Sequence, residues 1–142
     1  MREIEVVTVP GRKLGVDVRV GRHSLVSDEP ESNGGEDLGP VPHDLLVAAL
    51  GTCTAMTLEI YAARKGWPLQ GVRVVLGRSR SEEGLRISRR IEVSGPLDDA
   101  QRQRLLEIAE KCPVHRTLTG KFVIASEIAG DEVVNPDVGP TS

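Results

Sequence analysis

The stretch from Gly39 to Gly66 constrains this chain most, because it predicts one long helix that is apolar on every side. Residues 45–58 carry no charged side chain, and their apolar residues occupy all faces of a helix. A helix of this kind is normally buried. Pro42 suits its first turn, Asp44 complements the positive end of the helix dipole, and Gly66 follows as a cap. The sequence therefore predicts a central, buried helix.

This helix also constrains the assembly. We expect its apolar run to be too short for a membrane span, since Gly51 and three threonines interrupt it. A chain of 142 residues can build only a modest core, so covering such a helix on all sides is difficult. We therefore expect a second copy of the chain to cover part of it, in an obligate dimer with a large apolar interface.

Composition excludes several partners and assigns a compartment. A net charge of -3 and a pI near 5.6 give no reason to expect nucleic acid or a membrane surface. One Trp, one Tyr and one Phe leave no aromatic platform for stacking bases or sugars. Met1 is followed by a charged segment instead of a secretion signal, so we expect a cytoplasmic protein. We expect no cofactor. Two cysteines in a reducing compartment suggest redox or metal chemistry rather than a structural disulfide.

The remaining chain reads as an α+β domain of residues 1–130 followed by a flexible tail, residues 131–142. Asp98 and Gln101 form a capping-box pattern that opens a second helix, and Pro113 starts a short one after it. Alternation and turn signals predict strands at residues 3–9, 14–20, 23–27, 72–76, 85–93 and 121–128, with an acidic surface loop over 28–40.

Arg89 falls among the apolar residues of the strand at 85–93. One interpretation is a bulge or an edge position that lets the guanidinium reach water. The other is an inward arginine that serves an anion.

The two cysteines differ in what their local sequence offers. Cys112 directly precedes a proline-initiated turn, so backbone N–H groups can point at its sulfur and favour the thiolate. His115 could add a positive charge or a proton. Cys53 lies inside the long helix and has no such help. Local sequence therefore favours Cys112 as the more reactive thiol.

Two other interpretations of the cysteines stay open. Cys112 and His115 have a ligand-like spacing, and Cys53 with His43 or His23 could complete a zinc site. No second paired motif accompanies them, and we expect no metal. Alternatively, both cysteines are buried and inert.

The segment GPVPHDLLVAALGTCTAMTLEIYAARKGWPL, together with KCPVHRTLTG, closely resembles the OsmC/Ohr superfamily of osmotically inducible and organic hydroperoxide resistance proteins, in its OsmC-like branch. The similarity extends over most of the chain, to about residue 128. It implies an OsmC-like fold, with antiparallel sheets around a long central helix, and an intertwined homodimer in which two such helices pack together.

The resemblance also implies a peroxiredoxin-like oxidoreductase of the oxidative stress response. On the family pattern Cys53 attacks an organic hydroperoxide and becomes a sulfenic acid, and Cys112 resolves it as a disulfide that an external dithiol reduces. Here the resemblance contradicts the local preference for Cys112. We follow the family, because a cysteine on a turn can move toward a partner sulfur more easily than one within a helix.

The chain departs from the family pattern at the start of the long helix. Hydroperoxide-reducing members carry a glutamate where this chain has His43, and the nearest carboxylate is Asp44. Ten residues of helix span ~15 Å, so His43 cannot reach Cys53 within one straight helix.

Those members also carry an arginine that pairs with the glutamate and holds the thiolate. Arg12, Arg19 and Arg22 are the candidates for it in this chain. The activating pair is therefore altered or absent. The alternative function is a non-catalytic protein of this family that binds a small ligand or senses redox state.

Overall fold

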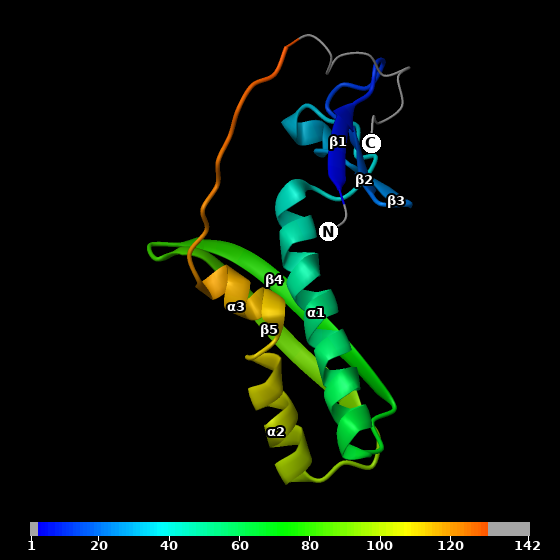
Figure 1. The fold of residues 1–142 in the computed structure, drawn as a ribbon, viewed down its shortest axis with the longest axis vertical. Helices are drawn as coiled ribbons and strands as arrows, with labels where there is room; N and C mark the ends of the chain where they lie inside the picture. The colour runs from blue at the N-terminus through cyan, green and yellow to red at the C-terminus, as the bar shows by residue number, and fades with distance from the viewer. Residues whose placement is uncertain (1–2, 131–142) are drawn as a thin grey trace. The chain divides into compact units, whose positions relative to one another are not determined.

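The computed structural model describes residues 3–130, so the predicted tail at 131–142 lies outside the described residues (Figure 1). They form two compact units, each described by itself below. The first comprises residues 3–45 and 124–130, and the second comprises residues 46–123. The combination of helices and antiparallel sheets confirms the predicted α+β class.

The first unit contains a three-stranded antiparallel sheet in the order β1-β2-β3. Its strands are β1 (Ile4–Thr8), β2 (Val16–Val20) and β3 (His23–Ser27), at the three predicted places. The turn between β2 and β3 contains Gly21, whose φ of 58° is a conformation that favours glycine. The acidic loop that follows includes a short helix, η1 (Glu31–Asn33).

Asp28 organises this acidic loop. Its side chain is 3% exposed and accepts hydrogen bonds from the backbone N–H groups of Glu29 at 2.8 Å and of Glu36 and Leu38, each at 3.1 Å. Burial alone would raise the pKa of Asp28, but these three N–H donors and the charge of Arg12 together hold it below its usual value. The loop is therefore closed around the Asp28 carboxylate, and its N–H contacts favour the ionised form.

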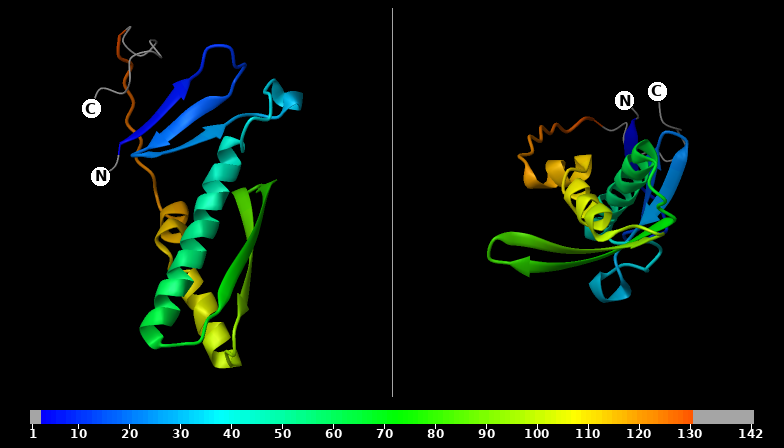
Figure 2. Two further views of the ribbon diagram at one scale, coloured as in Figure 1. Left: turned by 90° about the vertical axis from the view of Figure 1, so that its right-hand side faces the viewer. Right: turned by 90° about the horizontal axis from the view of Figure 1, so that it is seen from below.

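The second unit is a β-hairpin with helices on one of its faces, as both views of the ribbon show (Figures 1 and 2). Helix α1 (Pro42–Lys65) begins in the first unit and continues into the second. The hairpin of β4 (Gly71–Ser81) and β5 (Gly84–Ser94) follows, then α2 (Asp99–Ala109) and α3 (Pro113–Thr119). The predicted capping box is present, because Asp98 and Gln101 exchange hydrogen bonds of 2.7 and 2.9 Å.

The core of the second unit lies between α1, α2 and the hairpin. Leu58 of α1 packs with Leu105, Ile108 and Ala109 of α2, and partly buried residues of the hairpin surround them. Gly51 lets α1 approach β4 closely, since a Cβ at this position would lie 2.7 Å from Cδ1 of Leu76. This packing fixes the middle of α1 against the sheet.

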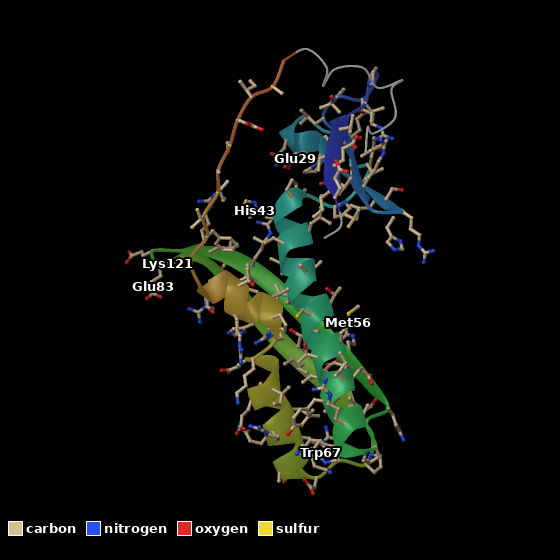
Figure 3. The ribbon with its side chains drawn as sticks, in the orientation of Figure 1. Glu29, His43, Met56, Trp67, Glu83 and Lys121 are labelled. Atoms are coloured by element: carbon tan, nitrogen blue, oxygen red, sulfur yellow. The ribbon has the colours of Figure 1, made fainter. Side chains whose placement is uncertain are left out.

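Helix α1 is apolar all round, as predicted, but the described chain covers only one of its faces. The buried face consists of Val47, Leu50, Gly51, Thr54, Leu58 and Ala62. On another face Leu46, Met56 and Ile60 are exposed by 41%, 64% and 54%. Figure 3 shows Met56 on the side of α1 that faces away from α2 and α3.

Length alone does not exclude a membrane span for α1, and one predicted strand is absent. By length and composition α1 could cross a membrane, although the core helix of a soluble protein meets the same criterion. The predicted strand at 121–128 is irregular backbone in the structure, and its apolar side chains are exposed. Alternation alone does not make a strand, because the backbone groups need a neighbouring strand to pair with, and within residues 3–130 this segment has none.

The role of Asp28 predicts a pH dependence. Its folded pKa lies below the ordinary 3.8, so its contribution to stability is complete above that value and is lost as pH falls through the folded pKa. Asp28→Asn should therefore lower the thermal midpoint at neutral pH, and the gap to the wild type should narrow in acid. Asp37→Asn, an exposed carboxylate in the same loop, is the control. Thermal unfolding across pH would contradict the role of Asp28 if the gap stayed constant.

Candidate functional site

Cys112 is buried at the start of α3 and caps that helix. Its backbone is extended, with φ of -65° and ψ of 147°, and the N–H of His115 points at its sulfur at 3.4 Å. Its own N–H donates to the carbonyl of Ala109 at 3.3 Å, which ties the turn to the end of α2. Pro113 has no N–H and a fixed φ, so it permits this extended residue followed by a helical turn. The predicted donation of an N–H to the sulfur of Cys112 is confirmed.

Cys53 lies in the middle of α1 and is half-buried. It stands at the edge of the buried face, directly before Thr54, which is fully buried. Its sulfur lies 3.9 Å from Oγ1 of Thr57, one turn further along the helix. Both Cys53 and Cys112 are free thiols in this structure.

Arg89 points inward from β5, and β4 and β5 pair regularly around it. Leu76 of β4 lies opposite Arg89 in an unbroken register, so the interpretation as a bulge is wrong. Nη1 of Arg89 donates to Oγ1 of Thr54 at 3.0 Å and to the carbonyl of Ala109 at 3.4 Å. Nη2 lies 3.0 Å from Nδ1 of His115. The guanidinium thus contacts α1, the end of α2 and α3.

These three contacts place Arg89 between the two cysteine-bearing segments. Thr54 follows Cys53 in α1. The carbonyl of Ala109 accepts from both Arg89 and the N–H of Cys112, and His115 donates its own N–H to the Cys112 sulfur. We call Thr54, Arg89, Ala109, Cys112 and His115 the Arg89 cluster. Arg89 is the residue for which the sequence analysis left an inward role open, and periodicity alone could not choose between that role and an edge position.

The contact with Arg89 determines the proton position on His115. A guanidinium can only donate hydrogen bonds, so the 3.0 Å contact is a hydrogen bond when Nδ1 of His115 accepts and the ring proton lies on Nε2. The suggestion from the sequence that His115 adds a positive charge or a proton stays a prediction. The positive charge of the cluster comes from Arg89, and none of its three acceptors is a carboxylate.

The other candidate residues lie in the first unit. Arg12 pairs with Asp17 at 2.8 Å and Arg19 with Glu5 at 3.5 Å, while Arg22 is exposed in the turn after β2. His43 and Asp44 lie in the first turn of α1, before the second unit begins, and Figure 3 labels His43 there. A part for His43 or Asp44 in the chemistry stays a prediction.

The metal interpretation needs several ligands in one place. Within residues 3–130 no group of three or more His, Cys, Asp and Glu side chains is arranged to hold a metal ion.

Sequence comparison identifies the family. A family model described as OsmC-like protein matches residues 34–127, which is well over half of the chain. No curated protein matches the sequence.

Solved structures match the fold over most of the chain. An OsmC-like protein from Mycoplasma pneumoniae has a TM-score of 0.71 at 21% identity, covering 84% of this chain and 88% of the other. An organic hydroperoxide resistance protein OsmC from Legionella pneumophila has a TM-score of 0.61 at 19% identity, covering 84% and 90%. The organic hydroperoxide resistance protein OhrB of Bacillus subtilis has a TM-score of 0.56 at 20% identity, covering 84% and 91%. At these identities the likeness shows a shared fold.

The tautomer of His115 can be tested by nuclear magnetic resonance. At a pH where imidazole rings are neutral, long-range proton–nitrogen correlation should show the His115 proton on Nε2, because Arg89 donates to Nδ1. Arg89→Met should remove this constraint and let the Nδ1–H form appear as well. His23 and His43, both exposed, are the internal controls. A proton on Nδ1 of His115 in the wild type would contradict the assignment.

Proposed function

Because the chain belongs to the OsmC-like protein family, we propose that it is a cysteine-based thiol peroxidase that reduces organic hydroperoxides. The observation that carries the proposal is the pair of free thiols, Cys53 and Cys112, on segments that share contacts with Arg89. The Legionella and Bacillus proteins of the same fold are named for organic hydroperoxide resistance, which supports this substrate class.

The proposed reaction begins at Cys53, the more accessible of the two sulfurs. Its thiolate attacks the O–O bond, so that one oxygen forms a sulfenic acid and the other leaves as an alcohol after taking a proton. The thiol of Cys112 then attacks the sulfenic sulfur, giving a Cys53–Cys112 disulfide and water. An external dithiol reduces this disulfide by exchange, which fits a reducing compartment such as the cytoplasm.

The structure supports different roles for the two cysteines. Cys112 is fully buried and receives a backbone N–H, so a bulky hydroperoxide has no access to its sulfur from solvent. Cys53 is half-buried and so keeps an exposure that Cys112 lacks. These positions favour Cys53 as the attacking residue and Cys112 as the resolving one, although the N–H groups at the start of α3 favour the thiolate form of Cys112.

Single cysteine variants test these roles. Cys53→Ser should abolish reaction with cumene hydroperoxide, because no attacking sulfur is left. Cys112→Ser should react for a single turnover and stop at a sulfenic acid that dimedone traps, as mass spectrometry would show.

The other outcomes have defined meanings. If Cys112→Ser does not react with the peroxide while Cys53→Ser forms the dimedone adduct, the roles of the two cysteines are reversed. A wild type that loses no thiols to the peroxide would exclude the peroxidase and favour the non-catalytic alternative, since His43 stands where the family glutamate is expected.

We further propose that the protein is an intertwined homodimer. Leu46, Ala49, Met56 and Ile60 share one side of α1 by their spacing of three, seven and four residues, and we call them the α1 seam. Such spacing suits helix-to-helix packing, and three of these side chains are exposed by 41% or more. The apolar residues of segment 121–128 are also exposed, and a second copy could offer them a strand to pair with.

A charge in the α1 seam should disrupt this assembly. Ile60→Glu should yield monomer or unfolded protein, because a carboxylate has no partner in an apolar interface, and Ala49→Glu should do the same. Arg90→Glu, on the exposed outer face of the hairpin, is the control. Light scattering that finds a folded wild-type monomer at micromolar concentration would contradict the dimer.

A further inference from the structure

Three helices converge on one guanidinium in the second unit. Arg89 reaches Oγ1 of Thr54 on α1, the last carbonyl of α2 at Ala109, and the ring of His115 on α3. These distances, 3.0, 3.4 and 3.0 Å, place all three acceptors within hydrogen-bond reach of its two terminal nitrogens. A planar guanidinium with donors in a rigid fork can hold several elements in a fixed relation.

The contacts lie on both sides of Cys112 and beside Cys53. Ala109 precedes Cys112 by three residues, and its carbonyl accepts the backbone N–H of Cys112. His115 follows by three residues, and its backbone N–H donates to the sulfur of Cys112. Thr54 adjoins Cys53 and is fully buried, with its hydroxyl donating to the carbonyl of Leu50 at 2.7 Å. Arg89 therefore holds the turn that carries Cys112 against the part of α1 that carries Cys53.

We propose that Arg89 is the positioning residue that keeps Cys112 within reach of Cys53, so that the disulfide between them is favoured. The inference rests on the proposed function for its biological role. A disulfide requires the two Cβ atoms to come within about 4 Å, and a small displacement of one segment removes that geometry. The role assigned to Arg89 concerns the resolving step, after the O–O bond has been broken.

The neutral acceptors around Arg89 make this role specific. A carboxylate would hold the guanidinium in one bidentate pair, but Thr54, Ala109 and His115 each take a single bond from different elements. A lysine has one ammonium at the end of a flexible stem and cannot reproduce the fork. Arg89→Lys should therefore keep the charge and lose most of the positioning.

The primary experiment measures disulfide formation without peroxide. Reduced protein is equilibrated with mixtures of oxidised and reduced glutathione, in which two protein thiols and one oxidised glutathione give the protein disulfide and two reduced glutathiones. The ratio of disulfide to dithiol gives the effective concentration of Cys112 at Cys53. Variants Arg89→Met and Arg89→Lys are compared with Arg90→Met, whose arginine is the next residue and is exposed, with an ion pair of 3.5 Å to Glu92.

The expected result is a fall in effective concentration of roughly tenfold or more in both Arg89 variants and no change in Arg90→Met. An unchanged value would overturn the proposal. A rise would overturn it as well, because it would mean that Arg89 holds the two sulfurs apart. If Arg89→Met does not fold, Thr54→Val removes the α1 acceptor with nearly the same shape and should also lower the value.

A second readout separates positioning from activation and from general structural damage. In a Cys112→Ser background, the rate at which Cys53 reacts with a small aromatic disulfide should be the same with and without the further substitution Arg89→Met. A slower reaction together with an unchanged effective concentration would assign Arg89 to thiolate activation and overturn the proposal.

A third readout uses cumene hydroperoxide. Arg89→Met should consume peroxide in its first turnover like the wild type but leave more sulfenic acid for dimedone to trap. Failure of the wild type to react would reject the peroxidase, whereas the glutathione measurement would still decide the role of Arg89.

Discussion

The need to cover helix α1 governs the second unit of this protein. Its residues are apolar on all sides, yet the hairpin and α2 cover one face, through contacts such as Leu58 with Leu105 and Gly51 with Leu76. Another face keeps Met56 and Ile60 more than half exposed, so only part of the roughly 1.5–3 kcal/mol that complete burial of each would contribute is gained. A helix of this kind is stable where a partner surface completes its burial, and the proposed dimer supplies that surface.

The same helix carries Cys53, the residue at which the proposed redox chemistry would begin. Cys53 is half-buried, next to the fully buried Thr54 and within 3.9 Å of Oγ1 of Thr57. A thiol on a rigid helix is well placed for attack but moves little. Cys112 is an extended residue between two helices, and its backbone bond to Ala109 and the N–H of His115 hold it in place.

Arg89 adds the electrostatic element that connects these segments. The Arg89 cluster contains a permanent positive charge and the thiol of Cys112, and none of the three acceptors of Arg89 is a carboxylate. Because each acceptor belongs to a different helix, the guanidinium acts on how these helices are held together, which is the positioning role proposed for it.

Local signals in the sequence determined the elements themselves. The bounds of α1 follow from Pro42 and Gly66, α2 starts at the Asp98–Gln101 capping box, and the cap at Cys112 follows from Pro113, because each depends on neighbours a few residues away. Only the tertiary structure decided the rest. It showed which arginine meets the cysteine segments, that the ring of His115 contacts this arginine, that one face of α1 stays exposed and that residues 121–128 form no strand. Each of these depends on groups far apart in the chain or on a pairing surface that local periodicity does not encode.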